Sequence, residues 1–291
     1  MQLLILGGTQ FVGRHLVEQA LANGHQLTLV HRGKTGADLF PECEHLLLDR
    51  SEGLGDLGER TWDAVIDVSG YVPRVVRLSC EALRGRVKRY VFVSTISVYD
   101  CNGQTTLDED SPQLVPPAWE VEEINGETYG GLKVACEREV LSAWGDSATI
   151  VRPGIVIGPY DHTKRFELWV RAMQGEGPVD VPQRSDQPVQ FIDGRDLGAF
   201  MLHVTENNTP GTYNAIGPVI PTTMGAMLST IKTTLSSKAE LISKPLAELE
   251  KAPLSLPEDG SHDALFCVSS TRGQAVGLKL RSLVDTVTAI A

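Results

Sequence analysis

LLILGGTQFVG, residues 3 to 13, is the stretch that decides the fold of this chain. Its first four residues are all apolar, which predicts a short buried strand. A glycine-rich turn follows, and residues 14 to 22, RHLVEQALA, carry apolar side chains at helical spacing. A strand, a glycine turn and a helix in this order suit a dinucleotide, because the glycines let the backbone approach the pyrophosphate and the helix N-terminus offers free N–H groups. Gln10 departs from the usual fingerprint, since it stands where a glycine is expected.

The composition is that of a globular protein. The 291 residues are 42% hydrophobic and 22% charged, with a net charge of −11. This charge argues against nucleic acid or an anionic membrane as a general partner, and no apolar run is long enough to span a membrane. The chain starts with a predicted strand, so we expect no signal peptide. Five scattered cysteines without metal-ligand spacing favour reduced thiols, a cytoplasmic location and no metal site.

Further apolar runs predict a parallel sheet. Strands are expected at residues 26–30, 46–48, 64–68, 90–94 and 148–151, with helices at residues 75–83 and 127–144. Apolar strands that alternate with helices indicate a sheet covered on both faces. The expected fold is therefore an α/β, Rossmann-type doubly wound parallel sheet. Residues 100–125 are rich in proline and acidic side chains and are expected to form a functional or disordered loop.

The pattern changes beyond Gly158, where proline and glycine become dense. We expect residues 1–154 to form the nucleotide-binding domain and residues 155–291 to form mainly a smaller substrate lobe. Residues 191–193 are expected to begin a helix that runs to Glu206, and residues 211–214 to form a short strand. The segment 191–214 is expected to return to the first domain. Residues 222–235 read as a helix and residues 254–264 as a loop.

Tyr129 and Lys133 form the strongest chemical motif after the glycine turn. They lie one helical turn apart, so their side chains share a face of the predicted helix. A lysine there is expected to lower the pKa of the phenol and make it a usable acid or base. An exposed helix face that carries both residues by chance is the alternative. Hydroxyls at residues 94–97 follow the fifth strand, where ligands of open α/β sheets bind, although turn chemistry also explains them.

These motifs resemble the extended short-chain dehydrogenase/reductase superfamily, in its NAD(P)-dependent epimerase/dehydratase group. The resemblance rests on five ordered stretches, residues 7–13, 92–99, 129–133, 152–159 and 191–197. More narrowly, residues 67–71, 96–99 and 190–193 look like a bacterial branch of isoflavone-reductase-like reductases. Substrates of that branch are generally unassigned.

The resemblance implies roles for individual residues. Tyr129 would be the acid/base, Lys133 its partner and a ribose ligand, and Thr95 the hydroxyl that orients the substrate oxygen. Asp49 would contact adenine, and Arg152 would lie near the nicotinamide. The full set expected to bind the cofactor is Gly7, Thr9, Gln10, Phe11, Val12, Gly13, His31, Arg32, Asp49, Arg50, Ser69, Gly70, Ser94, Lys133 and Arg152.

The end of the second strand predicts the choice of cofactor. It reads HRGK, residues 31–34, with no acidic residue before Asp38. An acid at this point selects NAD through the ribose 2′-OH, whereas an arginine accommodates a 2′-phosphate. Arg32 therefore favours NADP over NAD, with a solvated basic turn as the alternative.

The expected function is an oxidoreductase that moves hydride between the nicotinamide and a small-molecule or sugar carbonyl. The resemblance argues against dehydration as the net reaction, because Ile96 and Ser97 replace the acid pair of dehydratases. Epimerisation of a nucleotide sugar stays open. A low-activity cofactor-binding regulatory or RNA-associated protein is the alternative of another class. Relatives often pair through helices 75–83 and 127–144, so a homodimer is possible by resemblance. Three arginines of the substrate lobe could clamp a phosphate or carboxylate or could simply be solvated, namely Arg165, Arg171 and Arg184.

Overall fold

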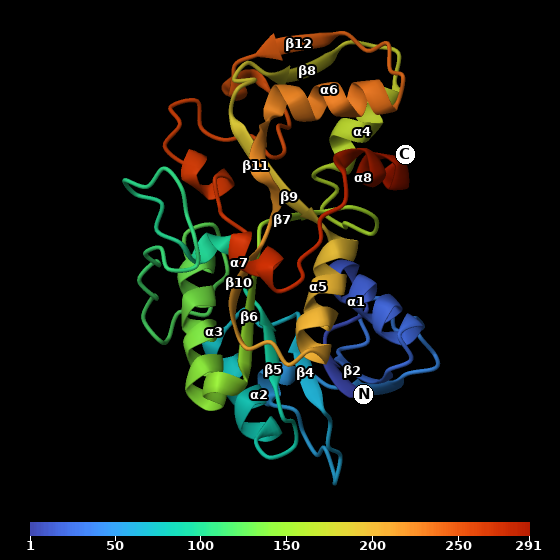
Figure 1. The fold of residues 1–291 in the computed structure, drawn as a ribbon, viewed down its shortest axis with the longest axis vertical. Coiled ribbons are helices and arrows are strands. Elements are labelled where there is room, and N and C mark those ends of the chain that lie inside the picture. The colour runs from blue at the N-terminus through green and yellow to red at the C-terminus, as the bar shows by residue number, and fades with distance from the viewer.

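Seven parallel strands form the central sheet of the computed structural model, which describes residues 1–291. The sheet order is β10-β6-β5-β4-β1-β2-β3 (Figure 1). The strands are β1 (Gln2–Leu6), β2 (Gln26–His31), β3 (Glu44–Leu47), β4 (Ala64–Asp67), β5 (Tyr90–Val93), β6 (Ala148–Pro153) and β10 (Gly211–Ala215). The sheet confirms the Rossmann-type prediction.

Both faces of the sheet are covered, because successive side chains of a strand point to opposite faces. Leu3 and Ile5 of β1 belong to a core that includes residues of α1 (Phe11–Ala22) and α5 (Gly194–Glu206). Leu4 and Leu6 belong to a second core. That core includes residues of α2 (Pro73–Leu83) and α3 (Tyr129–Trp144). In Figure 1 the two helix pairs lie on opposite sides of the sheet.

A smaller lobe lies beyond the carboxyl end of the sheet, at the top of Figure 1. It holds a core of 15 buried residues and two small sheets, of order β11-β9-β7 and β12-β8. Its strands are β7 (Ile155–Ile157), β8 (Val179–Pro182), β9 (Pro188–Asp193), β11 (Gly217–Thr223) and β12 (Leu241–Lys244). Its longer helices are α4 (Glu167–Gln174), α6 (Met224–Thr234) and α8 (Leu283–Ile290), and α7 (Thr271–Ala275) lies on the path between the lobes.

One predicted element is wrong. Residues 191–193 were expected to start a helix, but they end strand β9, and α5 begins at Gly194. Gln190 hides the strand pattern, because it is a polar residue at a fully buried position. Its side-chain amide donates to the carbonyls of Pro218 and Val268 and accepts from the N–H of Val268. Asp193 then caps α5 by accepting from the N–H of Arg195.

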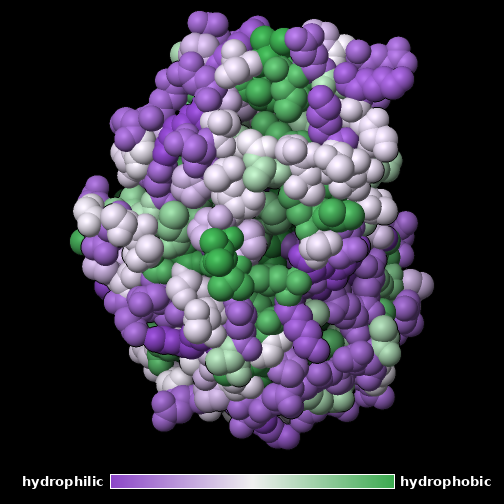
Figure 2. Space-filling view, turned by 45° about the horizontal axis from the view of Figure 1, so that its top comes forward, coloured by the Kyte–Doolittle hydropathy of each residue, from purple (hydrophilic) through white to green (hydrophobic).

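The surface is mixed in polarity. On the face shown in Figure 2, hydrophobic side chains gather across the middle, and hydrophilic residues cover most of the lower part. None of the helices combines the length and the apolar character needed to cross a membrane.

Candidate active site

The turn after β1 needs its glycines for two different reasons. Gly7 and Gly8 have φ values of +108° and +106°, which L side chains rarely adopt. Gly13 lies against the turn, since a Cβ there would be 2.6 Å from the backbone nitrogen of Gly8. The start of α1 is therefore packed directly onto the turn, as a site for a pyrophosphate requires.

Gln10 fits this turn without strain of its own. Its φ of −140° is extended backbone, and the left-handed value of +39° falls on the next residue, Phe11. The Gln10 side chain is exposed and does not cap α1. The first N–H groups of α1 therefore have no side-chain acceptor, and the positive end of the helix dipole is open to an anion. Thr9 and Phe11 are buried beside it, while Val12 is half-buried.

The end of β5 carries the hydroxyl cluster. The Thr95 hydroxyl accepts from the N–H of Ser97 at 3.1 Å and so caps a short 3-10 helix, Ile96–Val98. Ser94 is buried, and its hydroxyl has no hydrogen-bond partner. An unpartnered buried hydroxyl at the carboxyl edge of the sheet fits the predicted contact with a bound ligand.

Two glycines bring α3 to this cluster. A Cβ on Gly130 would lie 2.2 Å from the Ser97 carbonyl oxygen, and one on Gly131 would lie 3.0 Å from the Val115 carbonyl oxygen. Only glycine permits this approach. This approach brings the Tyr129 phenol next to the Thr95 hydroxyl, whose hydrogen bond acts to lower the pKa of the phenol.

Lys133 is buried beneath the same region, with 2% of its surface exposed. Its Nζ donates to the carbonyls of Gly70 at 2.6 Å and Val93 at 2.7 Å, which leaves one N–H free. It also lies 4.2 Å from the centre of the Phe92 ring. Burial lowers the pKa of Lys133 to about 8.

The expected effect of Lys133 on Tyr129 is not found. Burial raises the pKa of Tyr129 above its usual value, with Thr95 and Arg165 acting against burial. Lys133 is not among the causes, because its ammonium faces two backbone carbonyls rather than the phenol. Tyr129 is thus kept protonated, which suits a proton donor.

The loop after β4 is fixed by a buried ion pair. Arg50 donates to both carboxylate oxygens of Asp67, at 2.6 and 2.8 Å, and also to the hydroxyls of Ser69 and Ser79. Asp67 in turn accepts from the N–H of Ser69 and from the Tyr90 hydroxyl. Burial would raise the pKa of Asp67, but Arg50 holds it below its usual range. Arg50 therefore holds the Ser69-Gly70 loop, whose Gly70 carbonyl binds Lys133.

Arg152 is also occupied by protein partners. Its guanidinium forms a buried pair with Glu137 at 2.9 and 2.7 Å and donates to the Tyr99 hydroxyl and the Glu109 carbonyl. The Tyr99 hydroxyl in turn donates a hydrogen bond to the Asn214 side chain of β10. Arg152 thus connects β6 to α3 and, through Tyr99, to β10. Its guanidinium is used by these contacts, so near the nicotinamide it would hold the protein in shape and would not contact the cofactor as a free cation.

The predicted adenine side of the site lies at the edge of the sheet. The His31 ring accepts from the N–H of Gly33, and its Nε2 donates to His45, so both ring nitrogens are occupied. Asp49 is exposed and caps a 3-10 turn by accepting from the N–H of Ser51. Arg32 is exposed and has no carboxylate partner in the structure.

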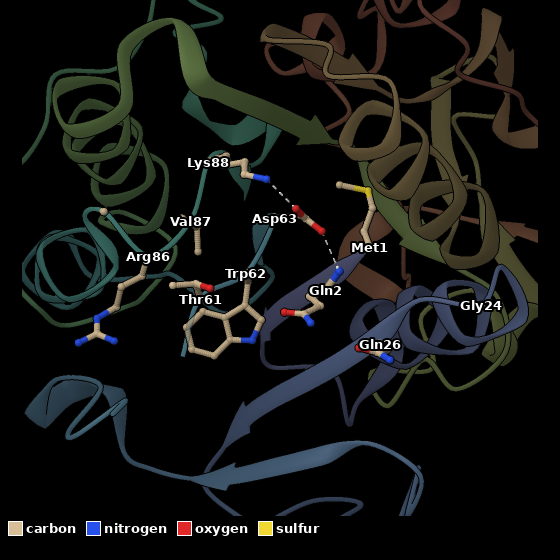
Figure 3. Close-up of a pocket in the computed structure, with 11 residues that line it drawn as sticks. Met1, Gln2, Gly24, Gln26, Thr61, Trp62, Asp63, Arg86, Val87 and Lys88 are labelled. Atoms are coloured by element: carbon tan, nitrogen blue, oxygen red, sulfur yellow. Dashed lines mark hydrogen bonds and ion pairs between the residues drawn. The ribbon is translucent and has the colours of Figure 1, made fainter. Parts of the chain in front are cut away.

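A hollow of about 720 Å³ lies at the amino end of the sheet, opposite the carboxyl end that carries the hydroxyl cluster (Figure 3). It is lined by Gln2 at the start of β1 and by residues just before β4 and β5, including Trp62 and Lys88. Asp63 lies there with its carboxylate bonded to the N–H of Gln2 and to the Lys88 ammonium. This hollow is separate from the cluster at the carboxyl edge.

Tyr71 is a neighbour of the candidate site that sequence motifs did not assign. Its ring centre lies 6.5 Å from that of Tyr129 and 5.4 Å from the Lys133 Nζ. The side chain is 44% exposed, so it stands at the mouth of the site. The sequence offered one indication of its place, because Tyr71 directly follows the Ser69-Gly70 loop that was expected to line the cofactor.

A family model for the NAD dependent epimerase/dehydratase family matches residues 3–216. This chain belongs to that family. The matched residues take in the whole nucleotide-binding turn, α3 and the strands up to β10.

Individual similarities are more distant. The chain is 27% identical over 222 residues to the chloroplast stem-loop binding protein of 41 kDa b from Arabidopsis thaliana, an alignment that covers 71% of this chain and 55% of that protein. The chain thus spans about half the length of this relative. The solved UDP-glucose 4-epimerase of Thermotoga maritima with UDP-glucose superposes with a TM-score of 0.74 at 17% identity, covering 100% of this chain and 97% of that one. UDP-glucuronic acid 4-epimerase from Bacillus cereus in complex with NAD gives a TM-score of 0.71 at 16% identity, covering 99% and 95%. These two likenesses show the fold.

Proposed function

We propose that this enzyme reduces a carbonyl group of a small molecule, or oxidises the matching alcohol, with Tyr129 as the acid/base. The observation that carries this proposal is the meeting of Tyr129, Thr95 and Lys133 at the carboxyl edge of the sheet. Burial favours the protonated phenol, and the Thr95 hydroxyl next to it would position a substrate oxygen.

The chain's residues fit a dinucleotide. The open N-terminus of α1 and the Gly7–Gly13 turn would hold the pyrophosphate, and the free N–H of Lys133 would bind the ribose. The unpartnered Ser94 hydroxyl would face the nicotinamide end. When bound, the nicotinamide supplies or accepts the hydride. We propose NADP rather than NAD, since Arg32 is exposed and unpaired where an acid would bind a ribose 2′-OH.

In the reductive direction, Tyr129 would donate its phenolic proton to the carbonyl oxygen, which becomes the hydroxyl of the alcohol once the hydride has been supplied. Thr95 orients that oxygen by donating a hydrogen bond. Lys133 does not face the phenol, and its free N–H would keep the cofactor ribose in place while the proton moves. A proton from solvent then restores the phenol.

A carbonyl screen tests this assignment. Aldehydes, ketones and UDP-sugars are offered to the wild type with NADPH or NADH, and the variant Tyr129→Phe is compared on any substrate that turns over. The expected loss in kcat is about 10²–10⁴-fold, with NADPH binding unchanged and NADPH preferred to NADH. Tyr213→Phe serves as the control, since the Tyr213 hydroxyl bonds the Pro210 carbonyl. Equal turnover in Tyr129→Phe and wild type would remove the catalytic role.

A further inference from the structure

Arg165 differs from the other two arginines that the sequence singles out in the second lobe. Arg171 is paired with Glu167, and Arg184 is paired with Asp263. Arg165 forms no ion pair in the structure, although the chain carries 37 acidic residues against 26 basic ones. An arginine left unpaired in such an acidic chain, and only partly exposed, is available to a negatively charged ligand.

Two residues hold the Arg165 side chain in place. Asp161 is buried and accepts from both the N–H and the hydroxyl of Thr163, at 2.9 and 2.6 Å. Because the Thr163 proton is directed to Asp161, the hydroxyl oxygen is free to accept from the Arg165 Nε at 2.9 Å. This relay orients the guanidinium and leaves its two terminal nitrogens without protein acceptors.

The loop that carries this relay is fastened to the glycine-turn helix. It follows β7, and the Pro159 carbonyl accepts from the His15 ring at 2.9 Å. The Arg14 guanidinium lies 3.6 Å from the centre of the Tyr160 ring. Arg165 is thus tied to the domain that carries the catalytic cluster.

The Arg165 guanidinium also affects the pKa of the Tyr129 phenol. Burial raises the pKa of Tyr129, and the Arg165 guanidinium is one of the two groups named above that oppose this effect. The same loop also reaches the glycine turn itself, since the His162 ring centre lies 6.3 Å from that of Phe11.

We propose that Arg165 binds a carboxylate or phosphate on the substrate while the reacting oxygen lies at Tyr129. This inference rests on the proposed function, and it defines the substrate as an anionic carbonyl compound or alcohol. The two free nitrogens suit a bidentate contact with two oxygens of the anion. The rival use of the same cation is a contact with the pyrophosphate of the cofactor, and the test separates the two.

Two matched pairs of probes test the charge requirement. They are 4-carboxybenzaldehyde with its methyl ester, and glyceraldehyde 3-phosphate with glyceraldehyde. Each is titrated by calorimetry into the full chain saturated with NADP⁺. We expect the anionic member of one pair to bind the wild type at least tenfold more tightly than its neutral partner, and the pair that responds identifies carboxylate or phosphate.

Variants then assign the preference. Arg165→Gln is expected to abolish it, Arg165→Lys to retain part of it, and Arg171→Gln to leave it intact. Equal preference in Arg165→Gln and wild type overturns the proposal, as does a wild type that favours neither anion. A tenfold weaker binding of NADP⁺ by Arg165→Gln, with the anion preference intact, also overturns it in favour of the pyrophosphate role.

Failure of the proposed function gives a different pattern. Tyr129→Phe should keep the anion preference in binding while it loses turnover. If Tyr129→Phe turns over normally, the acid/base assignment falls, and the calorimetric preference still decides the role of Arg165.

Discussion

At the scale of single residues, Lys133 is the group of the catalytic cluster whose charge changes closest to neutral pH. It is enclosed between the Gly70 and Val93 carbonyls and the Phe92 ring. These contacts favour the ammonium form, yet burial outweighs them and lowers its pKa to about 8. The amine is therefore protonated below that pH and increasingly neutral above it.

The pH profile of carbonyl reduction should reveal this titration. We expect kcat/KM to be level below about pH 8 and to fall above it, because Lys133 loses the positive charge with which it would bind the cofactor ribose. Lys133→Met should lower kcat/KM throughout and remove the limb near pH 8. The exposed Lys279 supplies the control, since Lys279→Met should keep that limb. A limb that persists in Lys133→Met would assign it to another group.

Helical spacing predicts that Tyr129 and Lys133 share one face of a helix, and the family resemblance adds the roles expected of them. The sequence could not predict which acceptors the Lys133 ammonium meets, since Gly70 and Val93 lie 63 and 40 residues away along the chain. Arg50 and Arg152 show the same limit. Each matched a family position for the cofactor, but their acid partners Asp67 and Glu137 become visible only in three dimensions.

At the scale of elements, the position of α3 depends on Gly130 and Gly131. Glycine inside a helix costs about 1 kcal/mol relative to alanine, so this pair weakens the helix locally. Close packing offsets this cost, because the helix can then approach the Ser97 and Val115 carbonyls. Sequence predicted the helix well, but the reason for its glycines is a tertiary contact.

Replacing Gly130 with alanine should damage both stability and the site. The new Cβ would lie 2.2 Å from the Ser97 carbonyl oxygen, so α3 must shift away from the Thr95 cluster. We expect a loss of about 1–3 kcal/mol in the free energy of unfolding, measured by urea denaturation, and a lower kcat. Gly126→Ala is the matched control, because nothing lies within 4 Å of a Cβ there. Equal stability of the two variants would contradict the packing argument.

At the scale of the whole molecule, Asp193 joins the end of β9 and the start of α5 to the C-terminal helix α8. It ends β9, accepts from Arg195 at 2.7 and 2.9 Å, and accepts from Thr286 of α8 at 2.8 Å. Arg281 lies 3.8 Å from it and is paired with Asp196. The sequence motif around Asp193 was recognisable, but its partners in α8 were not, because almost a hundred residues separate them. The helix expected at residue 191 was wrong for a related reason: the strand is completed by distant contacts.

Acid denaturation should depend on this carboxylate. Burial alone would raise the pKa of Asp193, but hydrogen bonds from Arg195 and Thr286 keep it below its usual range. A carboxyl whose pKa is lower in the folded state stabilises the fold above its unfolded pKa of about 3.9, and this stability is lost as the pH falls through the folded value. Asp193→Asn should therefore cost about 1.5–3 kcal/mol at pH 7 and flatten the loss of stability below pH 4, as followed by thermal melts across pH. Asp180→Asn removes only a surface pair with Lys244 and should change stability by less than about 1 kcal/mol. If both variants melt alike at pH 7 and in acid, the C-terminal segment is held by its apolar contacts instead of by Asp193.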